Sequence, residues 1–162
     1  MNSPAAPVRL GLISDTHGLL RPSVFDRLQG VLRILHAGDV GREDILRELE
    51  VIAPVTAVYG NTDGWELRRR LPQVAQVEEA GRRITVVHGD VPGSPTPARL
   101  AAAHGQADII VYGHTHQARV ERVGRTLVVN PGAAGPARFK LGPSLAILTL
   151  EGDEERVELL EL

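Results

Sequence analysis

The chain has 162 residues, an ordinary globular composition and a formal net charge of −2, which suits one domain with a hydrophobic core. The near-neutral charge predicts no general affinity for nucleic acid or anionic membranes, and no apolar stretch is long enough to span a bilayer. Because the chain has no cysteine, disulfides and thiolate metal sites are excluded, and any metal must take oxygen and imidazole ligands.

We expect a single domain over residues 1–162, because no stretch has the composition of a linker. Residues 1–7 are small and proline-rich, and they lack the basic and apolar regions of a signal peptide. The sequence therefore predicts a loose tail at residues 1–7 and a cytoplasmic protein.

Short apolar runs alternate with helical patterns in the first two thirds of the chain. The runs typical of buried strands cover residues 8–14, 31–35, 55–59, 84–87 and 109–112. The expected helices cover residues 22–29, with Pro22 in the first turn, residues 43–50, and a segment that begins at Thr96-Pro97 and ends at His104-Gly105.

The pattern changes after residue 116 from alternating strands and helices to strands alone. Residues 117–123 and 126–129 flank Gly124-Arg125 and predict a hairpin, and a Gly/Pro-rich loop covers residues 131–143. Two more strands are expected at residues 144–150 and 156–160. A core of two sheets covered by helices would accommodate both halves of the chain.

Each of the five apolar runs ends at polar residues that can bind a metal. In open α/β sheets the functional site lies outside the carboxyl ends of the strands, so we expect these residues to converge on one pocket. The five runs are followed by Asp15-Thr16-His17, His36-Ala37-Gly38-Asp39, Gly60-Asn61-Thr62-Asp63, His88-Gly89 and Gly113-His114-Thr115-His116.

These residue types suit a pair of divalent cations. A carboxylate such as Asp39 has two oxygens and can bridge two cations, whereas Asn61 offers a neutral oxygen and His88 an imidazole. Two divalent cations against Asp15 and Asp39 would leave about two positive charges, which can hold a hydroxide and an anionic substrate. Two metals ~3.5–4 Å apart are the usual centre for hydrolysis of phosphate esters.

The ordered motifs Asp15-x-His17, Gly38-Asp39, Gly60-Asn61, His88-Gly89 and Gly113-His114-x-His116 resemble those of the calcineurin-like metallophosphoesterases. The short length, Gly60-Asn61-Thr62-Asp63 and Asn130-Pro131-Gly132 resemble the small bacterial and archaeal phosphodiesterase branch of that superfamily. The resemblance covers residues 8 to 138. It implies an α/β fold, a four-layer α/β/β/α sandwich of two mixed sheets flanked by helices.

The resemblance also implies a dinuclear centre and assigns its ligands. The first metal would be bound by Asp15, His17, Asp39 and His116. The second would be bound by Asp39, Asn61, His88 and His114, which are also the expected catalytic residues. The mixed nitrogen and oxygen ligands favour Mn²⁺, with Fe, Ni or Zn as alternatives, over Mg²⁺ or Ca²⁺.

Two departures from the family pattern limit this transfer. Many relatives have a histidine directly after the asparagine that helps to stabilise the leaving group, whereas this chain has Thr62 and Asp63. The general acid is therefore unassigned. Ala133 stands where the branch often has serine, and Arg138 is a candidate for contact with the phosphate.

Other polar and aromatic residues leave alternatives open. His36 could support the site, donate a proton or be a buried strand residue, and Asp63 could orient His88 or another ligand or close a turn. For His104 we expect a favourable charge at a helix C-terminus. The basic run at residues 68–70 suits a solvated turn better than a substrate contact. Trp65 suits the core better than an interface or a stacked nucleobase.

The leading functional hypothesis is a metal-dependent phosphodiesterase that uses a hydroxide bridging two metals. The alternatives are a phosphomonoesterase or nucleotide phosphatase, and a non-catalytic interaction scaffold of the same fold. The expected partner is a small phosphate-ester substrate, with no specific nucleic acid and no membrane. The family also implies pairing of exposed strand edges, which would give a homo-oligomer.

Overall fold

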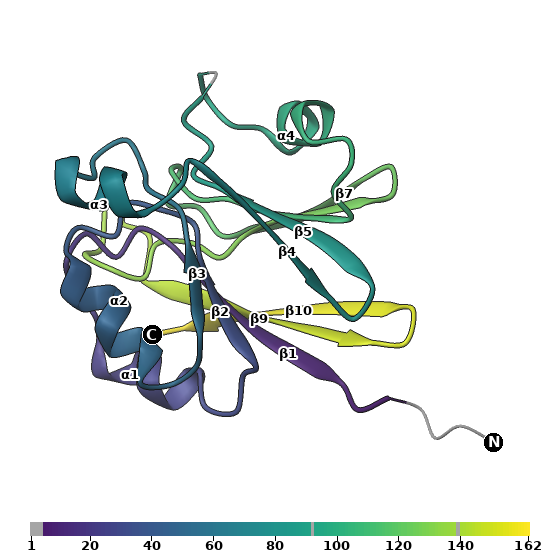
Figure 1. The fold of residues 1–162 in the computed structure, drawn as a ribbon, viewed down its shortest axis with the longest axis horizontal. Helices are drawn as coiled ribbons and strands as arrows, with labels where there is room; N and C mark the ends of the chain where they lie inside the picture. The colour runs from purple at the N-terminus through teal and green to yellow at the C-terminus, as the bar shows by residue number, and fades with distance from the viewer. Residues whose placement is uncertain (1–4, 92, 139) are drawn as a thin grey trace.

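The structure is a computed structural model that describes residues 5–91, 93–138 and 140–162 (Figure 1). The first of its two sheets contains β1 (Val8–Ile13), β2 (Arg33–His36), β3 (Val55–Ala57), β9 (Ser144–Glu151) and β10 (Glu154–Glu161). The second sheet contains β4 (Val74–Glu79), β5 (Arg82–Val87), β6 (Ile109–Val111), β7 (Arg119–Val123) and β8 (Thr126–Asn130). The helices are α1 (Pro22–Arg27), α2 (Glu43–Glu50), α3 (Trp65–Arg70) and α4 (Pro97–Ala103).

Both sheets mix parallel and antiparallel strands. The first has the order β10-β9-β1-β2-β3 and the second the order β4-β5-β6-β8-β7. In the first sheet β1, β2 and β3 run parallel, while β9 and β10 are antiparallel to their neighbours. In the second sheet β5, β6 and β8 run parallel, and the edge strands β4 and β7 are antiparallel.

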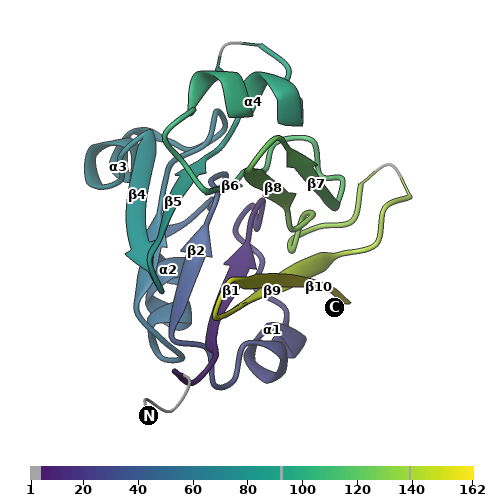
Figure 2. The same cartoon turned by 90° about the vertical axis from the view of Figure 1, so that its right-hand side faces the viewer.

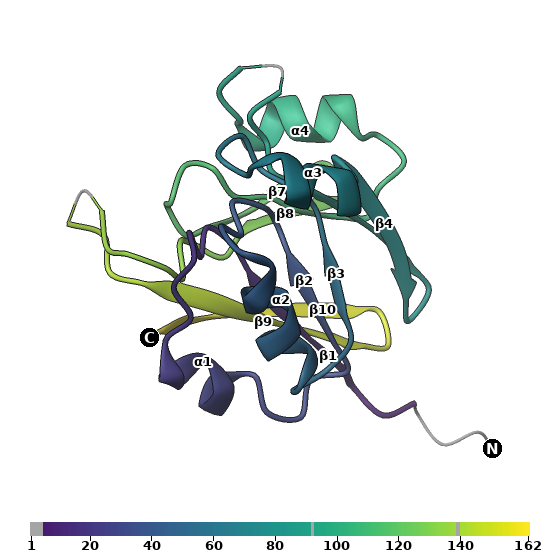
Figure 3. The same ribbon diagram turned by 60° about the vertical axis from the view of Figure 1, so that its left-hand side comes forward.

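The elements form the four-layer sandwich that the sequence predicts. Figures 2 and 3 show α1 and α2 together on the outer side of the first sheet and α4 over the second sheet. The two sheets lie between these helical layers. The α/β/β/α architecture is therefore confirmed.

The period-two pattern of the strands explains how three apolar layers form between the four structural layers. On β1, Leu10 and Leu12 point between the two sheets, where they join Ile84 and Val86 of β5 in the central core. The neighbouring residue Ile13 joins the layer between the first sheet and its two helices. The third layer packs Leu100 of α4 against the second sheet around Ile110, Tyr112 and Val128.

The three predicted helices, the predicted hairpin and the last two predicted strands form close to their expected positions. The α2 helix has the predicted bounds, and the Thr96 hydroxyl caps α4 by accepting the N–H of Arg99 at 3.2 Å. The α1 helix ends two residues early, because the backbone leaves the helical conformation at Leu28, with φ of −93° and ψ of 7°. The Gly124-Arg125 turn joins β7 to β8 as an antiparallel hairpin.

The α3 helix and the β4 strand replace a segment that the sequence leaves without regular structure. The α3 helix has six residues and buries only the side chain of Leu67, so it carries no periodic apolar signal. The β4 strand lies at a sheet edge and half-buries only alternate residues, among them Ala75 and Val77. Short, weakly buried elements of this kind cannot be predicted from apolar runs in the sequence.

Residues 5–7 are exposed and have no regular structure, as expected of a tail, whereas the predicted tail at residues 1–4 lies outside the described residues. None of the helices in the described segments has the length and apolarity needed to cross a membrane.

Candidate metal centre

All seven sequence-predicted ligands lie at the carboxyl ends of parallel strands, in five loops. Asp15 and His17 follow β1, and Asp39 follows β2. The remaining four residues follow β3, β5 and β6, and they are Asn61, His88, His114 and His116. Four of the seven side chains are buried and three are partly or fully exposed, so the group forms the floor of an open site.

One cluster of ligand atoms surrounds an oxygen of Asp15. Its Oδ1 lies 3.3 Å from Nε2 of His116 and 3.7 Å from Nε2 of His17, and these two nitrogens are 3.4 Å apart. The Asp15 side chain is fully buried, and its Oδ1 has no hydrogen-bond donor among the described residues. A buried carboxylate oxygen with no donor is satisfied when it binds a cation, so this donor set fits a metal.

A second cluster surrounds Oδ2 of Asp39. This oxygen lies 3.2 Å from Nε2 of His88, which is itself 2.9 Å from Oδ1 of Asn61. The same Asn61 oxygen lies 3.1 Å from Nδ1 of His114. Because Oδ2 of Asp39 is also 3.8 Å from Nε2 of His17, it faces both clusters.

Each carboxylate has one oxygen held by hydrogen bonds and the other directed to the centre. The hydroxyl of Ser14 and the N–H of His114 donate to Oδ2 of Asp15 at 2.7 and 3.1 Å. The N–H of Thr62 donates to Oδ1 of Asp39 at 2.9 Å. His88 is oriented similarly, since its Nδ1 lies 2.8 Å from the carbonyl of Ala37 and leaves Nε2 directed inward.

The backbone at the centre is strained. Five of the seven predicted ligands adopt the left-handed region, with φ of 54° at Asp15, 46° at His17, 55° at Asp39, 72° at His114 and 62° at His116. Outside glycine this conformation costs about 1–2 kcal/mol per residue, and it persists where the surrounding structure holds it. Such strain is concentrated at functional sites.

Two glycines are required because the ligand loops approach each other closely. A Cβ atom at Gly113 would overlap Oγ of Ser14 and crowd Oδ2 of Asp15 at 2.5 Å. A Cβ atom at Gly60 would overlap Oδ1 of Asp39. The glycines of these motifs therefore make room for the carboxylates.

Asp63 joins two of the ligand loops. Its carboxylate accepts the N–H groups of Gly60 and Gly41, each at 2.9 Å, and of Val40 at 3.2 Å. It therefore fixes the loop of Asn61 against the loop of Asp39, and these hydrogen bonds come from backbone N–H groups rather than from His88.

Arg68 supports the loop of Asn61, whereas the basic run at residues 68–70 predicts only a solvated turn. Its guanidinium donates to the carbonyls of Asp63 at 2.7 Å and Asn61 at 3.0 Å, and it stacks on the ring of Tyr59. The run forms the last turn of α3, and nothing in an isolated triplet of arginines predicts which one faces a loop.

Burial and charge act in opposite directions on the pKa values of three predicted ligands, His88, Asp15 and Asp39. Burial alone lowers the pKa of His88, but the hydrogen bond to Asp39 and the charges of Asp15 and Asp39 outweigh it and raise the pKa to about 9. Burial alone raises the pKa of Asp15, and the imidazoles of His116 and His17 hold it well below its usual range. Burial alone also raises the pKa of Asp39, but the hydrogen bond and the charge of His88 outweigh it, so that pKa is lowered.

Four further residues differ in how they relate to the sequence predictions. His36 is fully buried and contacts Thr16 and Gly38 rather than a ligand side chain. His104 ends α4 as predicted, but burial lowers its pKa and so disfavours the expected charge. Trp65 is 68% exposed, so its predicted place in the core is wrong. Arg138 is exposed and pairs through its backbone with Leu141, and its contact with phosphate stays a prediction.

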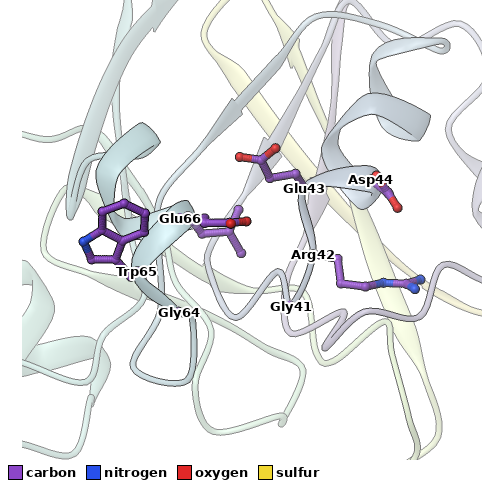
Figure 4. A pocket seen from close by; sticks show the side chains of 8 residues that line it. Gly41, Arg42, Glu43, Asp44, Gly64, Trp65 and Glu66 are labelled. Atoms are coloured by element: carbon purple, nitrogen blue, oxygen red, sulfur yellow. The ribbon is translucent and has the colours of Figure 1, made fainter.

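A pocket of about 590 Å³ opens between the loops that follow Asp39 and Asn61 (Figure 4). It is lined by residues 41–44 on one side and residues 64–67 on the other. The side chains of Glu43 and Glu66 lie between the two segments in this view, while Trp65 stands at the outer edge. The Trp65 ring is covered on one face by the guanidinium of Arg69, 4.5 Å from its centroid.

Comparison with known proteins agrees with this geometry. The chain is 35% identical to a probable metallophosphoesterase of Methanothermobacter thermautotrophicus, over 93% of this chain and 91% of the relative. It is 29% identical to a phosphodiesterase of Methanocaldococcus jannaschii, over 95% of this chain and the full length of that protein. Among solved structures, Vps29 of Entamoeba histolytica in complex with Zn²⁺ superposes with a TM-score of 0.74, at 22% identity, over 95% of this chain and 99% of that one.

The sequence profile of the calcineurin-like phosphoesterase superfamily domain matches residues 8–153. That range contains all seven clustered side chains and every strand except β10. The chain therefore belongs to the calcineurin-like phosphoesterase superfamily.

Proposed function

We propose that this phosphoesterase is a metal-dependent phosphodiesterase that hydrolyses small phosphate diesters at a dinuclear centre. The observation that carries the proposal is the position of Oδ2 of Asp39, which faces the His17 cluster and the His88 cluster. An oxygen in that position suits a bridge between two cations. A single-metal site would not need a second set of ligands on its other side.

The proposed ligands follow from the atoms that face each cluster. The first ion would be held by Asp15, His17, Asp39 and His116. The second would be held by Asp39, Asn61, His88 and His114, with Mn²⁺ as the proposed ion and Fe, Ni or Zn as alternatives. Two divalent ions would supply Lewis acidity and a water activated as hydroxide.

The chain's own residues would bind the substrate on the open side of the centre. Asp15, Asp39, His88 and His116 are buried beneath it, whereas Asn61 is exposed and His114 is partly exposed. The amide of Asn61 and the imidazole of His114 would therefore be the groups nearest to the non-bridging oxygens of a bound diester. Only two carboxylates balance the cations, so the centre favours an anionic ligand.

The decisive experiment compares a chromogenic diester with the matching monoester. Purified protein loaded with Mn²⁺ is expected to hydrolyse bis(4-nitrophenyl) phosphate faster than 4-nitrophenyl phosphate. Asp39→Asn should lose both ions by elemental analysis and nearly all turnover, because the bridge is weakened. His104→Ala is the control and should retain wild-type turnover, because that residue lies at the end of α4. Faster hydrolysis of the monoester would support the phosphomonoesterase alternative instead.

A scaffold role is the second candidate, because the fold is shared with Vps29. Metal binding alone does not separate the two, since the compared Vps29 structure itself holds Zn²⁺. Turnover does separate them. Metal-replete protein that hydrolyses neither the diester nor the monoester would overturn both enzymatic proposals and favour the scaffold.

A further inference from the structure

His36 is a buried polar residue that the proposed reaction does not use. It is the last residue of β2, and its side chain is fully buried. Its Nδ1 accepts the N–H of Gly38 at 3.1 Å, and its Nε2 lies 3.0 Å from Oγ1 of Thr16. The Thr16 hydroxyl in turn donates to the carbonyl of Val40 at 2.8 Å.

The donor and the acceptor are fixed in each hydrogen bond of the series that runs from Gly38 through His36 and Thr16 to Val40. The Gly38 N–H can only donate, so Nδ1 of His36 carries no proton. The Thr16 hydroxyl has one hydrogen, which goes to the carbonyl of Val40, so its oxygen must accept from Nε2–H of His36. The imidazole is therefore held as the neutral Nε2–H tautomer with both nitrogens in use.

The hydrogen-bonded chain crosses between the two loops that carry the carboxylates. Thr16 lies between Asp15 and His17, whereas Gly38 and Val40 lie on either side of Asp39. Backbone hydrogen bonds from Asp15 to Gly38 at 3.0 Å and from His17 to Asp39 at 2.9 Å run beside it.

Both carboxylates need such support. Asp15 and Asp39 lie in the left-handed region, with φ of 54° and 55°, and their loops would relax without contacts that hold them. The N–H groups of Asp15, His17 and Gly18 donate to the carbonyls of Gly38, Asp39 and Val40, so backbone hydrogen bonds join the two loops at three successive residues. The side chains of His36 and Thr16 add one further contact on each side of Asp39. The imidazole holds the Gly38 N–H on one side of Asp39, and the hydroxyl holds the Val40 carbonyl on the other.

We propose that His36 and Thr16 are positioning residues that hold Asp15 and Asp39 in the orientation in which the two carboxylates share a pair of metal ions. The inference rests on the metal-dependent function proposed above. Neither side chain touches the ligand atoms, so both act through the backbone of the Asp39 loop.

The test measures Mn²⁺ binding by calorimetry, with stoichiometry and the dissociation constant of each ion. Thr16→Val removes the hydroxyl at nearly constant shape, and Thr16→Ser keeps it. We expect Thr16→Val to weaken binding of at least one ion by about 10–100-fold, the range typical of groups that orient metal ligands. Thr16→Ser should bind both ions with the affinity of the wild-type protein. The electron paramagnetic resonance spectrum of the two coupled Mn²⁺ ions should change in parallel.

The variants of His36 separate its two hydrogen bonds. His36→Gln can still donate to Thr16, His36→Asn can still accept from Gly38, and His36→Leu can do neither. We expect the leucine variant to bind Mn²⁺ most weakly. Thr16→Val should weaken binding little further in the His36→Leu background, because both changes break the same chain.

Thr126→Val is the matched control, because the Thr126 hydroxyl also donates to a carbonyl, that of Ala107, at 3.2 Å, away from the centre. It should lower the melting temperature of metal-free protein without changing Mn²⁺ affinity. If Thr16→Val and His36→Leu behave like this control, the positioning role is overturned. Wild-type protein that binds two ions but hydrolyses nothing would refute the proposed function alone, and wild-type protein that binds none would refute both.

Discussion

The Asp39 carboxylate and the His88 imidazole form a buried pair, with 3.2 Å between Oδ2 and Nε2. The side chain of His88 is 1% exposed and that of Asp39 is 3% exposed. In metal-free protein this contact favours the imidazolium, and the pKa of His88 rises to about 9 from 6.5 although burial opposes the charge. A metal at the same place needs the neutral imidazole, so proton and metal compete for Nε2.

We therefore expect Mn²⁺ binding near pH 7.5 to release about one proton from His88. Affinity should rise with pH up to about pH 9, where the imidazole of the metal-free protein becomes neutral. Calorimetric titrations in buffers of different ionisation enthalpy measure the proton count. Heats that do not depend on the buffer would contradict the prediction.

In metal-free protein the Asp39–His88 pair should stabilise the fold more at low pH than at high pH. This dependence is opposite to that of Mn²⁺ affinity, which rises with pH. Because the folded pKa is raised above the unfolded value, the contribution is fully present below about pH 6.5 and is lost as the pH rises through about 9. Urea unfolding of metal-free protein at pH 6.5 and pH 9.5 measures this loss. In a His88→Gln variant the difference between the two pH values should shrink.

The left-handed backbone at His17 predicts a difference between two substitutions that both remove the imidazole. Metal-free His17→Gly should be about 1 kcal/mol more stable than His17→Ala, because glycine adopts φ of 46° without a steric penalty. Denaturant unfolding measures the difference. Ala80→Gly is a control for the backbone effect, since Ala80 has φ of 50° in the turn between β4 and β5. Equal stability of the two His17 variants would show that the turn is not strained.

The close packing at Gly113 predicts that a single methyl group disturbs the centre. In Gly113→Ala the new Cβ would overlap Oγ of Ser14 and push the Asp15 carboxylate from its position. We expect a loss of stability of about 1–3 kcal/mol and weaker Mn²⁺ binding, measured by unfolding and by calorimetry. Gly142→Ala is the control, because a Cβ atom there meets nothing within 4 Å. Unchanged Mn²⁺ affinity in Gly113→Ala would mean that the loops yield without moving Asp15.

The convergence of the seven predicted ligands could be predicted from the sequence because each lies in a loop that follows a strand of the sheets. Asp15 and His88, for example, come one or two residues after apolar runs whose length and composition predict the strands. The family resemblance rests on the specific residues of the motifs at these strand ends and on their order. Local information is sufficient where a residue's role depends on its place at the end of a strand.

The supporting contacts could not be predicted, because each joins loops that are distant in sequence. Asp63 accepts the N–H of Gly41, 22 residues away, and the hydroxyl of Thr16 contacts His36, 20 residues away. Such pairs depend on the register between parallel strands, which no local pattern contains. The exposure of Trp65 could not be predicted either, because α3 is too short to present an apolar face.

The three hydrogen bonds of Asp63 indicate whether this residue can be the general acid, which the family resemblance leaves unassigned. Its carboxylate accepts three backbone N–H groups, so both oxygens act as acceptors and neither is placed to give up a proton. Thr62 precedes it where many relatives carry histidine. We infer that Asp63 does not protonate the leaving group, and that hydrolysis depends steeply on how well the leaving group stabilises negative charge.

This inference predicts the kinetics of Asp63→Asn across a series of aryl phosphate diesters. The amide nitrogen would face a backbone N–H, so the variant should lose about 1–3 kcal/mol of stability and turn over more slowly. The slope of log kcat against the acidity of the leaving phenol should match that of the wild-type protein, because no proton donor has been removed. A steeper slope in the variant would instead identify Asp63 as the acid, and its hydrogen bonds would then have to rearrange when substrate binds.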